Sequence, residues 1–558
     1  MTLHYLKSTV KAEPLMWSWY AWPHLISPIT AACNIVERHL KIMQSYVQNP
    51  QIHAQAIKDP KLLGGPFVDL GGIQVPEIQA LITQTKKDCA ELILLHDVFK
   101  EFDRSLQAEA QGDSLESYYA RIPMPLKGLI ELVYDLNNHP SIRLIEPLIY
   151  QKYYSTEGQR IALSDTKSDF RKFVLSTPRI DQEDEVYLNI PFSDSRLDIL
   201  FRMKEEPQDL NKIRSLFDIP ESKKQLFQSF FTPAPQETTA HSKTLPLVVA
   251  STITTKTSTV SDNSNNRNYK GEGIRLRYFG HACVLVQTKS VSILFDPVIS
   301  YPIKTEEAQQ IPRYTLIDLP DHIDYVVITH NHQDHIMFEI LLQLRHKIGS
   351  IVFPANHPGA LEDPSIKLIL KHTGFSSLIE LKEMETITLE DGEITALPFL
   401  GEHSDLNIQS KRAYSIKLKD KQFLFAADSN NLDPTLYDHI FSYLGPIDML
   451  FLGMECDGAP LTWLYGPLLT GSLKRTHDRN RTLSGSNFEK AWVIAEKSEC
   501  KEAYVYAMGQ EPWLNYVMAL QYSPESPQII ESNKFIQSCQ AHGIVSERLF
   551  GKKEWMIE

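Results

Sequence analysis

One short segment, VVITHNHQDHIMFEI at residues 326–340, limits the possible folds more than any other part of the chain. It places three histidines and an aspartate within six positions, directly after an apolar run that is typical of a buried strand. Side chains alternate along a strand, so His330 and His332 are expected to face the same way, and a turn then brings Asp334 and His335 to a neighbouring point. Imidazole and carboxylate ligands suit zinc, iron or manganese. The segment therefore predicts a site for two metal ions at the end of a strand.

A polar stretch divides the chain into two parts. Thr, Ser, Asn and Pro dominate residues 232–273, and little of this segment can offset the entropy lost on ordering. We interpret it as a linker between domains at residues 1–231 and 274–558, with an ordered segment across the domain interface as the alternative. A chain of 558 residues is long enough for more than one core.

The N-terminal part is predicted to be a mixed α+β domain. Residues 76–110 space their apolar side chains at helical intervals and contain no Gly or Pro after the first residue, which predicts one long amphipathic helix. VYLNIPF, at residues 186–192, is typical of a strand. A group of large aromatic side chains near the start is either core or a contact for a subunit or partner: Trp17, Trp19, Tyr20 and Trp22.

Short β-type runs alternate with helix-like segments after residue 274, and several runs end in His, Asp or Glu. This order predicts a layered α/β domain with its site at the strand ends. The formal net charge of −13 disfavours a nucleic-acid partner. Six widely spaced cysteines without a CxxC pair indicate buried thiols in a reducing compartment. With neither a signal-peptide pattern nor a membrane-length apolar run, a cytoplasmic protein is expected.

The motif HxHxDH at residues 330–335, together with YFGHACVLVQ, ILFDP and FAADSNN, resembles the metallo-β-lactamase superfamily. The resemblance covers residue 274 to the last residue and implies an αββα sandwich with a two-metal site at one edge. It also implies that Asp428, in FLFAADSN, bridges the two metals. An exposed aspartate that caps the following turn is the alternative reading of Asp428.

The pair Glu402–His403 in LPFLGEHSDL separates two readings of the site. In a zinc hydrolase of this fold, such as a lactonase, amidase or phosphodiesterase, His403 completes the first metal and a late histidine completes the second. The late histidines are His439, His477 and His542. In the other reading Glu402 is the ligand, and the oxygen-rich set suits non-haem iron and dioxygen.

With Glu402 as the ligand, the chain resembles the metallo-β-lactamase-fold diiron β-hydroxylases, the type found in chloramphenicol biosynthesis. Chain length, a large N-terminal domain and a Glu in place of the usual third His carry the resemblance. It implies that His330, His332 and Glu402 bind one iron, and that Asp334 and His335 bind the other. Asp428 bridges the irons, and Glu455 in FLGMECDG is a supporting or proton-handling carboxylate, or else a solvent-facing strand-end residue.

This resemblance also implies a reaction and its partners. The expected activity is O₂-dependent hydroxylation of the β-carbon of an aminoacyl thioester on a peptidyl carrier domain of a nonribosomal peptide synthetase, in antibiotic or other natural-product biosynthesis. The expected cofactor is two oxygen-bridged iron ions, with electrons from an external reductase because no flavin or nicotinamide motif is present. The N-terminal domain is expected to form a homodimer or to frame the substrate.

One further segment, residues 458–492, begins apolar and becomes basic. Trp463, Leu464 and Tyr465 are candidates for an acyl pocket. The cations that follow suit an acidic carrier or its phosphate linker, with a solvated loop as the alternative: Lys474, Arg475, Arg479 and Arg481.

Overall fold

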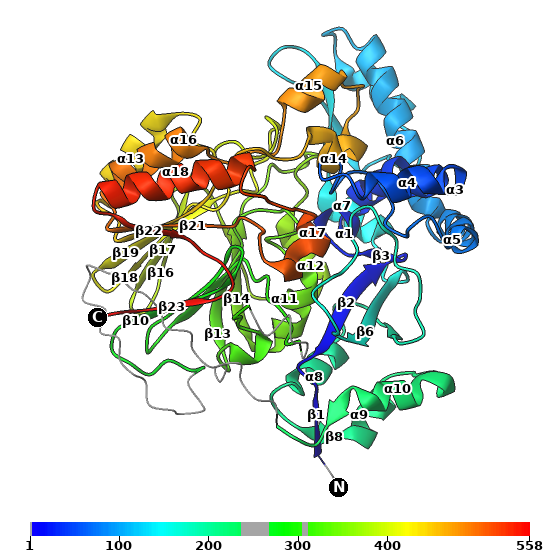
Figure 1. Cartoon of the computed structure of the whole chain (residues 1–558). Helices are drawn as coiled ribbons and strands as arrows, with labels where there is room; N and C mark the ends of the chain where they lie inside the picture. Colours follow the sequence, from blue (N-terminus) through cyan, green and yellow to red (C-terminus); the bar gives the residue numbers. More distant parts are fainter. Residues whose placement is uncertain (1–2, 236–266, 304–310) are drawn as a thin grey trace.

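The computed structural model describes residues 3–235, 267–303 and 311–558. Most of the predicted linker, residues 236–266, therefore lies outside the described residues. The described residues form two seven-stranded sheets in the C-terminal part and three smaller sheets in the N-terminal part (Figure 1).

The first large sheet mixes parallel and antiparallel strands. Its order is β15 (Leu378–Leu381), β14 (Ile348–Pro354), β13 (Ile323–Val327), β12 (Ser292–Phe295), β11 (Cys283–Gln287), β10 (Ile274–Gly280) and β23 (Lys553–Ile557). Strands β12 to β15 are parallel to one another, with Ile293 opposite Tyr325.

The second large sheet is also mixed. Its order is β16 (Thr386–Thr388), β17 (Gly392–Leu397), β18 (Ala413–Leu418), β19 (Lys421–Phe425), β20 (Met449–Gly453), β21 (Glu502–Tyr506) and β22 (Val545–Arg548).

The two sheets pack face to face. Successive residues of a strand point to opposite faces of its sheet, and here both faces are apolar, so one face can pack on the other sheet and the opposite face on helices. Ile293 and Phe295 point into the core between the sheets, where Phe295 stacks on Phe425 with ring centroids 4.1 Å apart. Leu294 points to the opposite face. Each such fully buried side chain contributes about 1.5–3 kcal/mol relative to exposure.

Helices cover the outer faces of both sheets (Figure 1). The first sheet is covered by α11 (Phe338–Leu344) and α12 (Ile366–His372). The second is covered by α13 (Pro434–Leu444), α16 (Phe488–Ser498) and α18 (Pro527–Ala541). The predicted αββα sandwich is confirmed. Shorter helical segments connect the layers: η6 (Leu316–Asp318), η7 (Arg345–Lys347), α14 (Leu461–Tyr465), η8 (Gly466–Leu468), α15 (Arg475–Asn480), η9 (Pro512–Leu514) and α17 (Asn515–Met518).

The N-terminal part is mixed α+β, as predicted. Its strands are β1 (Leu3–Leu6), β2 (Val10–Met16), β3 (Trp19–Tyr20), β4 (Ile130–Tyr134), β5 (Pro140–Leu144), β6 (Gln159–Asp165), β7 (Val186–Asn189), β8 (Gln208–Asp209) and β9 (Phe231–Thr232). Its helices are α1 (Pro23–Ile26), α2 (Pro28–Asn34), η1 (Ile35–Leu40), α3 (Lys41–Gln48), α4 (Pro50–Ala56), α5 (Val75–Asp88), α6 (Ala90–Glu109), η2 (Leu115–Arg121), α7 (Glu146–Tyr153), α8 (Arg196–Arg202), α9 (Leu210–Leu216), η3 (Glu221–Lys223) and α10 (Lys224–Ser229).

The single helix predicted over residues 76–110 is wrong in one respect, because the segment forms two helices. They are α5 and α6, and they meet at Cys89, whose φ of −104° and ψ of 21° depart from helical values. The two helices pack on different partners, α5 on α3 and α6 on α2. Apolar periodicity reports a buried face but not which neighbour covers it, so it cannot place this bend.

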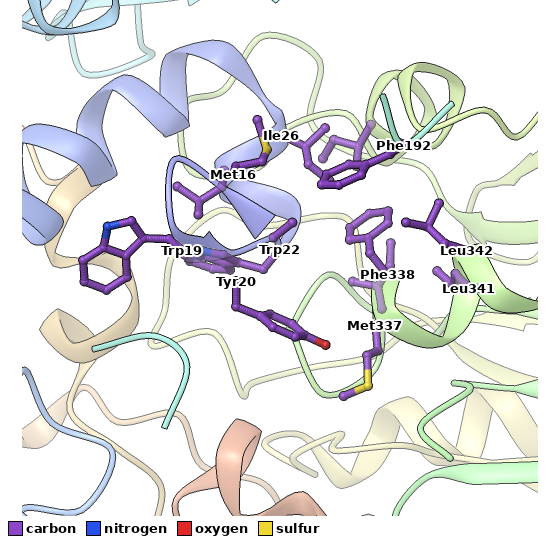
Figure 2. Close-up of a cluster of buried hydrophobic side chains, with 14 of the residues drawn as sticks. Met16, Trp19, Tyr20, Trp22, Ile26, Phe192, Met337, Phe338, Leu341 and Leu342 are labelled. Atoms are coloured by element: carbon purple, nitrogen blue, oxygen red, sulfur yellow. The ribbon is translucent and has the colours of Figure 1, made fainter. Parts of the chain in front are cut away.

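Three members of the aromatic group near the start are buried in the core: Trp19, Tyr20 and Trp22. In Figure 2 Tyr20 extends toward Met337, which directly precedes α11, whereas Trp19 lies farther away. The N-terminal part thus packs directly on the segment that follows the predicted metal motif.

The cysteines are mostly buried, as predicted. All six cysteines are free thiols, and only Cys456 is not fully buried. Among the described residues, no helix combines the length and the apolar character needed to span a membrane.

Candidate metal centre

The predicted metal motif forms a tight turn after β13. The backbone N–H of Ile328 still donates to the Val352 carbonyl at 2.9 Å, so the strand pairing continues past the end of β13. The N–H groups of His335 and Ile336 then both donate to the His332 carbonyl, at 3.1 and 3.0 Å. The turn lies at the carboxyl end of a parallel strand, where α/β sheets usually place their sites.

Three side chains converge on one point: His330, His332 and Glu402. Glu402 Oε1 lies 2.8 Å from His332 Nδ1, and Glu402 Oε2 lies 4.0 Å from His330 Nε2. All three side chains are buried. Burial opposes ionisation of Glu402, but the imidazoles of His332 and His403 prevail and lower its pKa to about 2. The carboxylate is therefore charged and ready to bind a cation.

Glu402 is held in an unusual backbone conformation. Its φ is 66°, and φ of the preceding Gly401 is 73°. A Cβ on Gly401 would lie 2.4 Å from the Cβ of Asn430, so only glycine fits there. Lys411 Nζ donates to the Gly401 carbonyl at 2.9 Å and supports the turn. Non-glycine residues with positive φ cost about 1–3 kcal/mol and gather at functional sites, which suits a ligand-bearing loop.

A second group adjoins the first and shares His330 with it: His330, His335 and Asp428. Asp428 Oδ2 lies 3.0 Å from His335 Nε2 and 3.7 Å from His330 Nε2, so one carboxylate faces both groups. Asp334 Oδ2 lies 3.4 Å from His335 Nε2. The alternative reading of Asp428 as an exposed cap is wrong, because its side chain is buried.

Supporting contacts fix which ring nitrogen of each histidine faces the cluster. Asp296 Oδ2 lies 2.8 Å from His335 Nδ1, and Asp296 also accepts from the backbone N–H of Thr329 at 2.8 Å. The Tyr465 hydroxyl lies 2.9 Å from His332 Nε2. These partners leave Nε2 of His335 and Nδ1 of His332 directed at the carboxylates, an arrangement common around metal-binding histidines.

His281 was not predicted as a site residue. It has φ of 52°, and its Nε2 lies 3.1 Å from Asp334 Oδ2. Its Nδ1 accepts from the Gly509 N–H at 3.2 Å, so the proton sits on Nε2 and points at Asp334. Glu511 accepts from the His281 backbone N–H at 3.2 Å and holds the turn. The motifs YFGHACVLVQ and ILFDP contain His281 and Asp296, but sequence alone assigns them no contact.

Glu455 follows β20 and is partly buried. Burial and the nearby carboxylates of Asp428 and Asp334 raise its pKa well above the usual value. The side chain thus lies within electrostatic range of the cluster, which is consistent with the predicted supporting or proton-handling role.

The histidines that a zinc hydrolase would require are placed differently. His403 is buried, and its Nδ1 lies 2.8 Å from Glu402 Oε2, so it contacts the carboxylate but belongs to none of the three-residue clusters. His439, His477 and His542 are exposed. Tyr465 of the predicted acyl-pocket segment adjoins the site, and Arg481 of the basic segment donates to the Ser404 carbonyl at 2.9 Å.

Unpartnered buried atoms test whether metal ions fit this cluster. His330 Nε2 and Asp428 Oδ1 are both buried and have no hydrogen-bond partner among the described residues. Buried polar atoms are nearly always satisfied, so such a group needs an explanation. His330 belongs to both adjoining groups and Asp428 to the second, and a nitrogen–oxygen donor set suits iron. The residues fit a pair of metal ions.

Comparisons with known proteins agree with this reading. Residues 5–235 match the family of diiron non-heme β-hydroxylase N-terminal domains, and residues 292–459 match the β-lactamase superfamily domain. The chain is 34% identical over 547 residues to the Streptomyces venezuelae enzyme named 4-amino-L-phenylalanyl-(CmlP-peptidyl-carrier-protein) 3-hydroxylase, covering 98% of each chain.

Solved structures give the same result for the whole chain. The crystal structure of CmlA, a diiron β-hydroxylase from Streptomyces venezuelae, superposes with a TM-score of 0.87 at 32% identity and covers 100% of both chains. A mutant of CmlA superposes with a TM-score of 0.86 at 32% identity, covering 99% of this chain and 100% of the other. The chain therefore belongs to the diiron non-heme β-hydroxylases, enzymes that join this N-terminal domain to a metallo-β-lactamase domain.

Proposed function

We propose that this enzyme hydroxylates the β-carbon of an aminoacyl group held as a thioester on a peptidyl carrier domain of a nonribosomal peptide synthetase. The match along 98% of the chain to an aminoacyl-carrier hydroxylase carries the proposal, because it includes the N-terminal domain as well as the metal domain.

We further propose the ligand set. His330, His332 and Glu402 hold one iron, Asp334 and His335 hold the other, and Asp428 bridges them. The distances and burial described above support this division. Two iron ions bound there would supply the chemistry of dioxygen reduction. Overall, two external electrons and two protons are consumed, one oxygen atom enters the C–H bond and the other leaves as water. An external reductase is the proposed electron source, and a homodimer is the proposed assembly.

The reaction itself gives the first test. Iron-loaded, reduced enzyme is incubated with oxygen and a set of aminoacyl carrier proteins, and the intact carriers are weighed by mass spectrometry. We expect one carrier-bound aminoacyl group to gain one oxygen atom. Loss of the aminoacyl group without oxygen uptake would instead indicate thioester hydrolysis and would refute the proposal.

A contact behind one proposed ligand gives a second prediction. Asp296→Asn keeps the size of the side chain but removes the charge that holds the Nδ1 proton of His335. Loss of such a contact typically lowers metal affinity about 10- to 100-fold. We expect weaker binding of one iron, measured by competition with a chelator. Unchanged affinity for both irons would show that Asp296 does not orient a ligand.

A further inference from the structure

Two adjoining cavities lie between the N-terminal helices and the segment around α14. The smaller has a volume of about 140 Å³, and its lining includes Arg38, Trp463 and Phe173. The larger has a volume of about 660 Å³, and its lining includes Lys41, Lys100 and Arg104. Glu37, Thr462 and Gly466 line both cavities.

Arg38 is a buried cation without a counter-ion. Its residue is 7% exposed, and no described carboxylate forms an ion pair with it. Its Nη2 donates to the Leu464 carbonyl at 2.7 Å, and its Nε is buried and unpartnered. Burial lowers the pKa of Arg38 to about 10, which leaves the side chain charged at neutral pH. Buried charges are normally paired, so an arginine lining a cavity in this state indicates an anion site.

The backbone at Arg38 is also unusual. Arg38 lies in η1, a π-helical segment between α2 and α3. Such segments are rare and are found frequently at functional sites.

A continuous series of side chains connects this cavity to the metal centre. The Arg38 guanidinium lies 5.9 Å from the Trp22 ring, and the Trp22 and His24 rings are 4.7 Å apart. His24 lies 6.1 Å from the ring of Tyr465, which contacts His332. Both ring nitrogens of His24 are buried and have no hydrogen-bond partner among the described residues.

We propose that Arg38 binds the phosphate of the phosphopantetheine arm that carries the substrate into the site. The inference rests on the proposed function, since only a carrier-bound substrate brings this phosphate. Guanidinium groups bind phosphate through two parallel hydrogen bonds, which makes arginine better suited than lysine. The adjoining cavity adds no net charge, so recognition of the phosphate falls to Arg38; the lining of that cavity has three cations and three carboxylates: Lys41, Lys100, Arg104, Glu37, Asp97 and Glu101.

Binding of 4′-phosphopantetheine and of pantetheine to the full-length, iron-loaded enzyme tests this site. Both affinities are measured by calorimetry. A charged hydrogen bond contributes enough for the phosphorylated compound to bind roughly 10- to 100-fold more tightly. Arg38→Gln is expected to remove this preference while the affinity for pantetheine, the iron content and the visible spectrum stay unchanged. A preference retained in Arg38→Gln, or absent in the unmodified enzyme, would overturn the inference.

Two further variants keep the test decisive. Arg104→Gln removes an exposed cation from the larger cavity and is expected to keep the preference; loss of it there instead would move the phosphate site away from Arg38. If Arg38→Gln fails to fold, Arg38→Lys retains the charge and is expected to bind phosphopantetheine more weakly than the unmodified enzyme but still to prefer it. Equal binding by Arg38→Lys and the unmodified enzyme would contradict a guanidinium site.

Failure of this inference is distinct from failure of the proposed function. Carrier hydroxylation by the unmodified enzyme without any Arg38-dependent phosphate preference would remove only the phosphate site. Phosphate preference without hydroxylation of any carrier-bound substrate would remove the proposed reaction instead.

Discussion

Glu402→Ala is expected to remove one of the two irons and to abolish hydroxylation. Glu402 is charged and buried, with Oε1 2.8 Å from His332 Nδ1 and Oε2 4.0 Å from His330 Nε2. Under the proposed ligand set, the variant would leave that iron with two imidazoles and the bridging carboxylate alone. The loss of iron affinity should exceed the roughly 10- to 100-fold loss that follows removal of a supporting contact. The iron-to-protein ratio and the visible spectrum of the purified variant measure it.

His403→Ala is the matched control, because His403 is the neighbouring residue and is also buried. His403 Nδ1 lies 2.8 Å from Glu402 Oε2, so its removal loosens the carboxylate without removing a proposed ligand. We expect this variant to keep both irons and to lose part of its activity. The opposite pattern, with iron lost only from His403→Ala, would make His403 the ligand and Glu402 the supporting residue.

The sequence alone does not decide whether Glu402 or His403 is the metal ligand. The HxHxDH motif predicts its own geometry, because ligands a few positions apart are placed by strand alternation and one tight turn. Glu402 and His403 are distinguished by positive φ at Gly401 and Glu402, which turns the carboxylate toward His332. The need for glycine at Gly401 comes from Asn430, a residue on another loop, and no local pattern reveals that contact.

In the fold, too, features set by neighbouring residues could be predicted, and features set by distant contacts could not. The apolar runs that open VVITH, ILFDP and FLFAADSN lie on β13, β12 and β19, and burial on both faces accounts for such continuous apolar sequences. Asp296 and His281 stand in recognisable motifs, but their partners His335 and Asp334 are 39 and 53 positions away. The bend at Cys89 likewise depends on two different packing partners. Contacts between distant segments are what the sequence alone did not predict.

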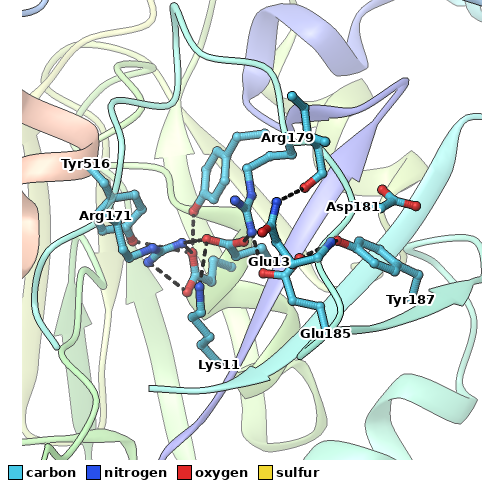
Figure 3. Close-up of polar contacts among 12 residues, drawn as sticks. Lys11, Glu13, Arg171, Arg179, Asp181, Glu185, Tyr187 and Tyr516 are labelled. Atoms are coloured by element: carbon cyan, nitrogen blue, oxygen red, sulfur yellow. Dashed lines mark hydrogen bonds and ion pairs between the residues drawn. The ribbon is translucent and has the colours of Figure 1, made fainter. Parts of the chain in front are cut away.

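Glu339 is the centre of a polar cluster that joins the N-terminal part to the metal domain. It lies in the first turn of α11, four residues after His335, and its side chain is fully buried. Arg171 donates to both of its carboxylate oxygens, at 3.2 and 2.8 Å, and Tyr20 and Tyr301 each donate to it at 2.9 Å. Glu13 is a second carboxylate of this cluster, and Figure 3 shows it between Arg171 and Arg179.

Glu339→Ala is expected to lower the free energy of unfolding by about 3–5 kcal/mol, because it leaves the buried Arg171 guanidinium short of a counter-ion. Urea titration of the metal-loaded enzyme measures the loss. Glu380→Ala is the control, since Glu380 pairs with the exposed Lys367 and such pairs contribute at most about 1 kcal/mol. Equal losses in the two variants would refute a special role for the cluster.

The position of Glu339 adds a second expected result. Because α11 begins three residues after the metal motif ends, loosening its first turn should also disturb the turn that carries Asp334 and His335. We therefore expect Glu339→Ala to lose iron faster to a chelator than the unmodified enzyme does, at urea concentrations where both remain folded. If stability falls but the rate of iron loss does not change, the cluster only joins the domains. If both change, the N-terminal domain helps to hold the metal loop in place, although it supplies none of the proposed ligands.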